Sequence, residues 1–424
     1  MIQAMFSGVS GMKAFKSALD VVGNNIANAN TTAYKSQGVT FKEALSQTIN
    51  SASAPSASRG GTNPSQIGLG VSIGSITTKS AQGSLTYTGN DTDMAIDGDG
   101  YFVLGGGEGI SYTRDGGFAL DSNYNLVSSS SGKYALGWQA DATTGVLDTS
   151  SAITSSSKIE IPVGKMSLAE ATDTAELAGN LDASSATGDD YTVSFDIYDS
   201  LGTTHTLDVT FTKLAVDAAA TPPIGPSTWR YDVMCDDVST TVPVATGNIT
   251  FSSTGYSNLA SIPLSLTFAT NNGSVTPLVA SIDTSTLSQL DGDNTVALSS
   301  VDGMSYGTLE SYTIDASGII TGTFTNGATR TIAQVAMASF DNPSGLTKEG
   351  SNLYSESPNS GRALISTAGS GSLGTITSGY LEASNVDLAA EFASMIVAQR
   401  GFQANSRIIT ISDQVLEELV NLKR

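Results

Sequence analysis

The feature that most constrains this chain is an apolar repeat in its last 40 residues. From Leu388 the chain can be followed in steps of four and three, and seven of the ten positions reached are apolar: Leu388, Phe392, Met395, Phe402, Ile409, Leu416 and Val420. This spacing predicts a helix with one narrow apolar stripe, as in a coiled-coil seam. Asn385 and Asp387 precede the repeat and indicate a helix start, so we expect a helix over residues 386–421.

The N-terminus carries a repeat of the same kind. Seven positions from Met5 step by three and four, and every one except Gly8 is apolar: Met5, Gly8, Met12, Phe15, Leu19, Val22 and Ile26. Two amphipathic helices with similar seams at opposite ends of one chain are expected to pair with each other. An ordinary pair of terminal helices lying on a core is the alternative that this pattern leaves open.

The C-terminal helix has more apolar surface than one partner would cover. A second apolar set lies beside the first: Ile396, Ile408, Ile411, Val415 and Leu419. A helix that is apolar on more than one face is buried on more than one side. Neighbouring copies of the chain in a polymer would supply that cover.

The middle of the chain is predicted to be β-structure. Residues 191–211 alternate between polar and apolar side chains around a turn at 199–202, and Trp229 to Cys235 alternates again. Long βαβ patterns are absent, which argues against a parallel α/β sheet. The Ser/Ala/Pro/Gly-rich residues 51–65 are typical of a linker or a partly ordered connection.

We therefore expect a mainly β protein with a terminal α-helical coiled coil and nested, discontinuous domains. Residues 1–70 and 385–424 would form a helical domain with its linker. Residues 71–148 and 300–384 would form a middle β domain, and residues 149–299 an inserted outer β domain of barrel or sandwich type.

Charge is concentrated in the interior of the sequence. The 424 residues include 40 acidic and 19 basic ones, for a net charge of −21, and residues 51–384 alone carry −22. Such an acidic surface repels phosphate backbones and anionic membranes, so we expect no nucleic-acid partner. No run of about 18 apolar residues is present, so we expect no membrane insertion. The N-terminus also lacks the pattern of a cleaved secretion signal.

The residues that most enzymes use are scarce. The chain has one His and one Cys, so the two Gly-x-Ser-x-Gly matches at 70–74 and 303–307 lack a nearby histidine base in the sequence. The Asp-Gly pairs at 97–100 and 291–294 lack the spacing of a calcium loop. We expect His205 to be a strand residue and Cys235 a buried apolar one. We therefore predict no enzyme activity, no catalytic residue, no metal site and no cofactor.

Two terminal segments resemble the signatures of a known family. Asn24 to Ser36, with the sequence NNIANANTTAYKS, and Ser378 to Asp413 resemble those of the bacterial flagellar rod and hook proteins, the axial protein family. The positions that carry this resemblance are Asn24, Asn25, Asn28, Asn30, Tyr34, Lys35, Asn385, Gln399, Arg400, Gln403 and Asn405. Ala33 stands where the family often has Gly, which makes a left-handed backbone there less expected.

Interior segments extend the resemblance to the family's β domain, and the inserted domain around residues 191–211 is similar to that of its hook members. The resemblance implies a subunit of a curved, flexible tube that transmits torque from rod to filament. Its terminal helices would form the inner tube, and the seam residues of both helices would be assembly contacts. Two alternatives remain: a distal rod subunit, or an acidic extracellular adhesin.

The resemblance also implies the partners and the location. The chain would form a helical homopolymer and meet the flagellar rod, the hook cap and the hook–filament junction proteins. It would leave the cell unfolded through the flagellar type III export apparatus, without a cleaved signal, and end up in the extracellular flagellar hook.

Overall fold

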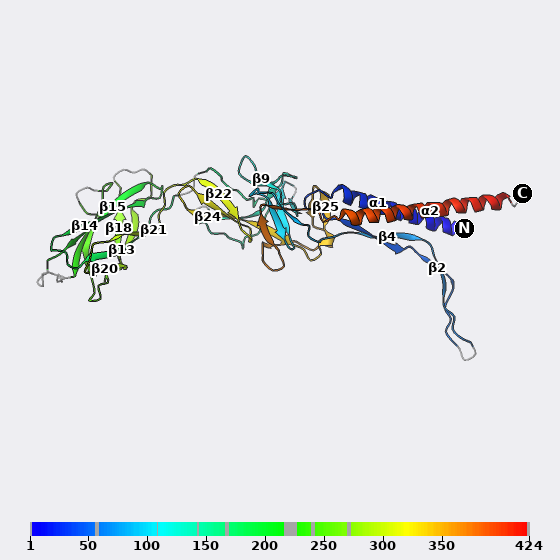
Figure 1. The fold of residues 1–424 in the computed structure, drawn as a ribbon, viewed down its shortest axis with the longest axis horizontal. Helices are drawn as coiled ribbons and strands as arrows, with labels where there is room; N and C mark the ends of the chain where they lie inside the picture. The colour runs from blue at the N-terminus through cyan, green and yellow to red at the C-terminus, as the bar shows by residue number, and fades with distance from the viewer. Residues whose placement is uncertain are drawn as a thin grey trace.

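The computed structural model describes residues 2–55, 59–107, 109–141, 144–165, 169–215, 227–238, 242–268 and 273–421. The chain is mainly β-structure with two terminal helices, as predicted, and it is stretched along one long axis (Figure 1). Helices α1 (Ile2–Ala27) and α2 (Leu388–Asn421) lie side by side at one end, with both termini. Two β units follow along the axis, which we call the middle unit and the outer unit.

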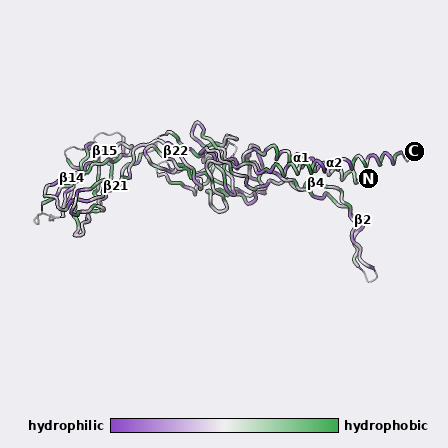
Figure 2. The backbone as a smooth tube through the Cα atoms, viewed as in Figure 1, coloured by the Kyte–Doolittle hydropathy of each residue, from purple (hydrophilic) through white to green (hydrophobic). Residues whose placement is uncertain are grey.

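Helix α2 starts close to where the sequence predicts. The Asp387 carboxylate accepts hydrogen bonds from the main-chain N–H groups of Ala389 (2.9 Å) and Ala390 (3.2 Å), so Asp387 is the N-cap. Asn385, which the sequence also suggested as a start signal, has its side chain turned elsewhere. Hydrophobic and hydrophilic residues alternate along both helices (Figure 2).

Residues 37–55 and 59–78 form a long two-stranded ribbon, which we call the arm. It consists of β1 (Gln37–Glu43) paired with β4 (Val71–Thr78), continued by β2 (Ser46–Asn50) paired with β3 (Ser65–Gly68). The half of the arm formed by β1 and β4 lies beside the helices, and the half formed by β2 and β3 projects away from them (Figure 1).

Where the structure describes residues 51–65, they fit the partly ordered connection better than a free linker, because Ser53 and Thr62 still pair across the ribbon. Their hydroxyls hydrogen-bond at 2.7 Å, as do those of Thr40 and Ser75. Cross-strand hydroxyl pairs of this kind stabilise a ladder, and composition does not reveal them.

The middle unit takes strands from before and after the outer unit. Its main sheet has the order β22-β23-β24-β7-β11-β10-β9. The long central strand β24 pairs with β7, β12, β23 and β27. Two short pairs, β28–β6 and β29–β5, join the returning chain to the outgoing one. The strands are β5 (Leu85–Tyr87), β6 (Met94–Asp97), β7 (Tyr101–Gly106), β8 (Gly109–Thr113), β9 (Phe118–Leu120), β10 (Leu126–Ser128), β11 (Tyr134–Ala135), β12 (Gly137–Gln139), β22 (Leu309–Ile314), β23 (Ile319–Phe324), β24 (Thr329–Ser339), β25 (Thr347–Gly350), β26 (Leu353–Ser355), β27 (Leu364–Thr367), β28 (Thr375–Ser378) and β29 (Tyr380–Glu382), with a 3-10 turn at Pro343–Gly345.

The middle unit departs from the predicted boundaries at two places. Ile159 and Ile161, expected in the inserted domain, are fully buried in the middle core with Phe102 and Leu126. Residues 71–78, expected in the middle domain, belong to the arm. The insertion therefore starts later than residue 149, because the segment after the predicted break returns to cover the middle sheet.

The outer unit, residues 169–304, has two facing sheets around its own core. One sheet contains β13, β18, β19, β20 and β21, and the other has the order β14-β15-β16-β17. Trp229 and Phe211 are fully buried between them. The strands are β13 (Thr174–Asp182), β14 (Asp190–Tyr198), β15 (Thr204–Lys213), β16 (Thr228–Cys235), β17 (Ala245–Thr250), β18 (Ser261–Leu266), β19 (Leu278–Asp283), β20 (Leu287–Leu290) and β21 (Ala297–Val301).

The predicted hairpin of residues 191–211 is confirmed. Tyr191 pairs with Phe211 and Ile197 with His205, across a turn at 199–202. Alternate residues of both strands point into the core, as the alternation required. The unit begins and ends at one place, because Glu170 and Met304 form an antiparallel bridge.

Candidate assembly surface

The two helices meet through small residues. The buried face of α1 runs through Gly8, Gly11, Ala14 and Ala18. A Cβ on Gly11 would lie 2.7 Å from Oδ1 of Asn405, and a Cβ on Gly401 would lie 2.6 Å from the ring of Phe15. Larger residues at these positions would force the helices apart, so the glycines set the close approach.

The predicted seam of α1 lies beside this contact. Val22 is buried in it, and the other five predicted residues are half-buried on its flanks: Met5, Met12, Phe15, Leu19 and Ile26. Gly11, Ala14 and Ala18, each one position before a predicted seam residue, lie at the centre of the contact. Their small size allows the two helices to lie closer together. The Phe15 ring also packs against Phe41 of the arm, with ring centroids 5.5 Å apart.

The predicted seam residues of α2 fall into two groups, one at the helix pair and one away from it, and the assembly role of both remains a prediction. Met395, Phe402, Ile409 and Leu416 are half-buried towards α1. The positions between them are filled by smaller or polar side chains that the prediction did not include: Glu391, Ala398, Asn405 and Ser412.

Three predicted seam residues instead lie outside the helix pair. Leu388, Phe392 and Val420 are 44%, 50% and 67% exposed. The small-residue contact leaves them uncovered in the single chain, and their role as assembly contacts remains a prediction.

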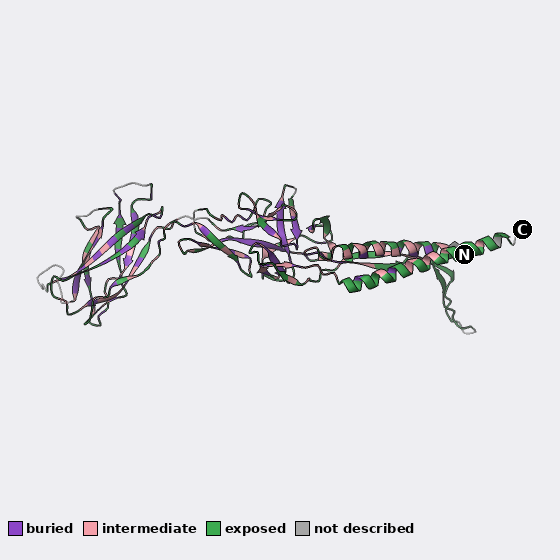
Figure 3. Ribbon diagram, turned by 45° about the horizontal axis from the view of Figure 1, so that its top comes forward, coloured by how far each residue is buried: buried purple, intermediate pink, exposed green. Residues whose placement is uncertain are grey.

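The outward face of α2 remains apolar along most of its length. Ile396 and Val397 are 58% and 66% exposed, and Ile408, Ile411 and Val415 are exposed as well; the side chain of Leu419 lies outside the described residues. Exposed residues run along both helices, whereas the buried ones concentrate in the β units (Figure 3). Contiguous exposed apolar surface on a water-soluble chain marks an interaction site.

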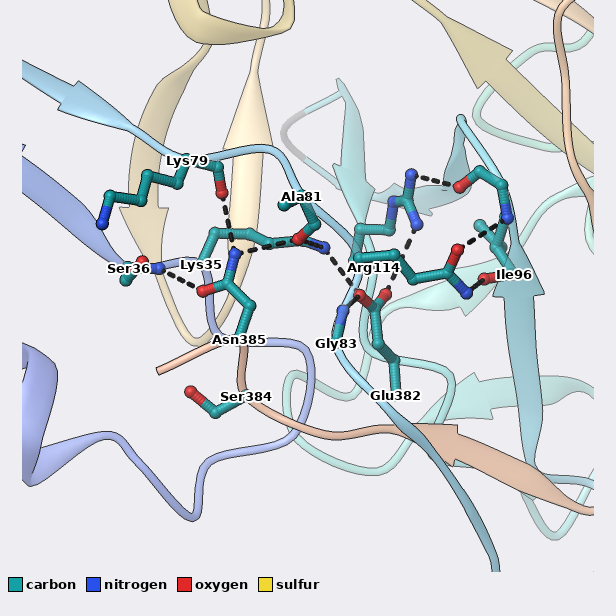
Figure 4. Close-up of polar contacts among 12 residues, drawn as sticks. Lys35, Ser36, Lys79, Ala81, Gly83, Ile96, Arg114, Glu382, Ser384 and Asn385 are labelled. Carbon is teal, nitrogen blue, oxygen red and sulfur yellow. Dashed lines mark hydrogen bonds and ion pairs between the residues drawn. The ribbon is translucent and has the colours of Figure 1, made fainter. Parts of the chain in front are cut away.

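A buried ion cluster joins the helical end to the middle unit, and we call it the anchor: Lys35, Arg114, Glu382 and Asn385 (Figure 4). Glu382 accepts from Lys35 Nζ at 2.6 Å, from Arg114 Nη1 at 3.4 Å and from the Gly83 N–H at 2.7 Å. All three charged side chains are at most 4% exposed. Burial lowers the pKa of Lys35, and the bond to Glu382 opposes that shift.

Asn385 completes the anchor with three hydrogen bonds. Its Oδ1 accepts from the Ser36 N–H at 2.8 Å, and its Nδ2 donates to the carbonyls of Lys79 (3.0 Å) and Ala81 (2.9 Å). One side chain thus ties together the end of α1, the end of the arm and the start of α2.

The asparagines at the end of α1 hold the turn that delivers Lys35. Asn25, fully buried, bonds both the N–H and the C=O of Gln37, at 3.0 and 2.8 Å. Asn24 donates to the Tyr34 hydroxyl at 3.0 Å, and Asn28 donates to the Asn24 carbonyl at 2.9 Å. The structure therefore brings together six of the predicted motif residues.

The remaining motif residues lie elsewhere. Asn30 is exposed beyond the end of α1, and Gln399, Arg400 and Gln403 are exposed on α2. Asn405 lies in the helix contact and donates to the Gly401 carbonyl at 2.8 Å. The anchor therefore does not include Asn30, Gln399, Arg400 or Gln403.

Ala33 adopts the left-handed backbone that the sequence made less expected, with φ of 54°. The expectation is wrong because the fold constrains this position strongly. Its N–H donates to the Glu382 carbonyl at 2.8 Å, and the side chain is buried. The conformation costs about 1 kcal/mol for a residue with a Cβ, and these contacts offset it.

Glu382 and Arg114 were not predicted as site residues. Both lie within segments that resemble the family, but nothing in the sequence shows that residues separated by 268 positions meet. The only signal in the sequence was that each of the two family-like segments contains a charged residue, Arg114 in one and Glu382 in the other.

The described residues offer little for catalysis. No three His, Cys, Asp or Glu side chains among them gather as metal ligands. His205 lies on β15, stacked on Phe268 with centroids 3.8 Å apart, and its Nδ1 is 2.7 Å from Asp237. Burial raises the pKa of Cys235. Among the helices the structure describes, none is long and apolar enough to cross a membrane.

Comparison with known proteins decides the family. The chain is 36% identical to the flagellar hook protein FlgE of Treponema pallidum, over the whole of both chains. The chain belongs to the flagellar hook protein family. It is also 33% identical to the FlgE of Escherichia coli over 99% of this chain and all of that one. The flagellar basal-body rod protein FlgG of Bacillus subtilis is 32% identical over the whole of both chains.

Matches to family domains cover most of this hook-family chain. Residues 5–35 match the flagella basal body rod protein and residues 377–422 the C-terminal domain of the FlgEFG rod proteins. Residues 95–173 match the D1 domain of the hook protein FlgE/F/G, and residues 167–304 match the FlaE D2 domain. The crystal structure of the Helicobacter pylori flagellar hook protein FlgE2 shares the fold, with a TM-score of 0.52 at 16% identity over 70% of this chain and all of that chain.

We predict that Glu382→Gln lowers the free energy of unfolding by about 3–5 kcal/mol, because it leaves Lys35 and Arg114 as buried cations without a countercharge. Chemical denaturation of the monomer measures this loss. Glu160→Gln is the matched control, since it removes the same charge from an exposed Glu–Lys pair 2.9 Å long. The control is expected to lose at most about 1 kcal/mol. Equal losses in the two variants would show that the anchor is not a stabilising cluster.

Proposed function

We propose that this chain is the structural subunit of the flagellar hook, a curved and flexible tube that self-assembles and transmits motor torque from rod to filament. The observation that carries the proposal is the uncovered apolar face of α2, centred on Phe392, Ile396 and Val397. Among the described residues of the single chain, none covers these three side chains fully. In a tube of parallel subunits, the helices of neighbouring copies would lie against it.

The elongated shape supports a layered tube (Figure 1). We assign the helix pair and the arm to the inner layer, the middle unit to the next layer and the outer unit to the surface. The layers correspond to residues 1–78 with 385–424, residues 79–168 with 305–384, and residues 169–304. These bounds replace those expected from sequence, because residues 149–165 pack with the middle unit.

The arm adds to the assembly surface in this proposal. It carries exposed large apolar residues on a thin ribbon that lacks a core of its own: Phe41, Leu45, Ile49, Ile67 and Ile76. A two-stranded ribbon in water is marginally stable by itself. Contact with a neighbouring copy would bury these residues and hold the ribbon in place.

Flexibility would come from the outer layer. The exposed face of the sheet β14–β17 is covered by hydroxyls and carboxylates that bond to one another, as Thr206 bonds to Asp196 and Thr246 to Asp232. Water-bridged polar contacts exchange at little energetic cost, so such surfaces can slide past each other as the tube bends. While the outer surfaces slide, the buried anchor would keep each helix pair rigidly attached to its own middle unit.

The remaining assignments follow from the same proposal. The polymer would contact the rod at one end, the hook cap during growth and the hook–filament junction proteins at the other end. The chain would be exported by the flagellar type III apparatus and would act outside the cell. An extracellular adhesin would account for the outer unit but not for the apolar face of α2.

A distal rod subunit is the second candidate, and the full-length similarity to a protein named FlgG favours it. A hook subunit and a distal rod subunit are both expected to have these inner helices, so the helices do not distinguish the two functions. Labelling the protein on isolated flagella separates them, because a hook subunit marks the curved segment outside the cell and a rod subunit marks the straight segment below it.

We predict that Phe392→Ser weakens assembly without affecting the monomer. Phe392 is half exposed, and covering the exposed half of such a side chain contributes about 0.8–1.5 kcal/mol. Its loss corresponds to a rise in the critical concentration for polymerisation of about four- to tenfold. Sedimentation measures the critical concentration, and circular dichroism follows thermal unfolding of the monomer.

Phe402→Ser is the comparison variant, because Phe402 contributes to the contact with α1. We expect it to lower both helix stability and assembly. An unchanged critical concentration in Phe392→Ser would contradict an assembly role for the outward face.

We predict that the chain still polymerises when residues 171–303 are replaced by a short glycine linker. Glu170 and Met304 exchange hydrogen bonds of 3.3 and 2.9 Å, so the cut joins two positions that already touch. Electron microscopy should show tubes whose curvature differs from that of the full chain. Absence of tubes from a truncated chain that keeps its helices would contradict the layered arrangement.

A further inference from the structure

The middle unit has an open groove at its face near β23 and β24. It has a volume of about 550 Å³ and lies between residues 139–165 and the strands β23–β24. Apolar side chains, including Phe324 and Ile332, form part of its lining. Three cationic side chains also line it: Lys158, Lys165 and Arg330.

Two of these cations form no ion pair with a described residue, although the charge of Lys158 is near enough to Asp121 to help lower its pKa. Lys165 pairs with Glu160 at 2.9 Å. Lys158 lies over the ring of Tyr134, 4.9 Å from its centroid, and neither Lys158 nor Arg330 forms an ion pair with any described residue. The other carboxylate of the groove, on Asp141, accepts from the N–H and the hydroxyl of Thr144 at 2.8 and 3.2 Å.

The outer unit has the opposite charge. Residues 169–304 contain seventeen Asp and Glu but only two basic residues, Lys213 and Arg230, for a net charge of −15. Many of its carboxylates gather at the end remote from the middle unit: Asp182, Asp189, Asp190, Asp291 and Asp293. The strand register places them there, because β13 runs away from the bridge at Glu170 and β20 lies parallel beside it, with Asp182 opposite Leu290.

Strand β24, which contributes to the groove, and strand β20, whose last residue is opposite Asp182, lie apart along the long axis of the molecule (Figure 1). A chain therefore cannot place its own acidic end in its own groove. In a polymer, outer units that each carry −15 would repel one another unless cations of a neighbour approach them.

We propose that the groove is an interaction site for the acidic outer unit of a second copy, with Lys158 and Arg330 binding its carboxylates. The inference rests on the proposed self-assembly and adds a specific electrostatic contact to it. A carboxylate held by a lysine or arginine at a partly covered site forms a charge-assisted hydrogen bond. Such contacts weaken as salt rises, which gives the site a distinctive signature.

The direct test is zero-length crosslinking with a carbodiimide, which couples a lysine amine to a carboxylate. Polymers are grown from an equal mixture of ¹⁴N- and ¹⁵N-labelled full-length chains, and crosslinked peptides are identified by mass spectrometry. Mixed-isotope peptides joining Lys158 to a carboxylate within residues 169–304 are the expected result. The Lys165–Glu160 pair is the internal control, because it should crosslink within one chain in monomer and polymer alike.

Charge-reversal variants test the same contact by a second readout. Lys158→Glu and Arg330→Glu should each raise the critical concentration about tenfold at low salt, and the difference should vanish near 1 M salt, where charges are screened within about 3 Å. Arg362→Glu is the matched control, since Arg362 is exposed on the same unit and does not line the groove.

The outcomes separate the two proposals. Polymers that form normally but give no intermolecular crosslink from Lys158 to the outer unit, and in which the groove variants behave like Arg362→Glu, would overturn the groove contact alone. A wild-type chain that forms no polymer would overturn the proposed function and the groove contact together.

Discussion

The architecture depends on how closely α1 and α2 approach each other. Gly8, Gly11 and Gly401 allow a contact in which Phe15 and Asn405 reach the opposite backbone. A contact made of small residues contributes little apolar burial of its own, and isolated helices in water are marginal. The large apolar side chains of α2, such as Phe392 and Ile396, consequently point away from α1 and need another partner. This constraint makes the helical end incomplete as a single chain and suited to a polymer.

The anchor connects the helical end, which needs partner chains to cover it, to the middle unit, which has a buried core of its own. The middle and outer units each have a buried core of aromatic and aliphatic residues, and neither needs a neighbour to exclude water. Lys35, Arg114 and Glu382 link them to the helices through a buried, hydrogen-bonded ion cluster. A buried cluster tolerates little displacement, because breaking any pair leaves an uncompensated charge. Force on the helices would therefore be transmitted to the β units, while the polar outer surfaces adjust.

Periodicity predicted the elements whose cause is local. The hairpin of residues 191–211 and the span of α2 follow from side-chain alternation and heptad spacing, and both appear in the structure. Leu388, Phe392 and Val420 lie away from the helix contact because the partner helix presents glycines, which favour Ala398 and Asn405 over larger residues there. Ribbon formation near Ser53 and the left-handed Ala33 were missed because both depend on contacts across the fold. The hydrogen bonds of the anchor span up to 349 positions, and one sequence does not contain that information.

Amide hydrogen exchange on α2, compared between monomer and polymer, tests the central claim most directly. If the outward face of α2 is an assembly surface, amides between Phe392 and Val415 should exchange quickly in the monomer and slow markedly on polymerisation, since packing by neighbours supplies the missing stability. Amides in the core strand β15 should exchange at the same slow rate in both states. Strong protection of α2 in the monomer, with no further slowing in the polymer, would contradict the account.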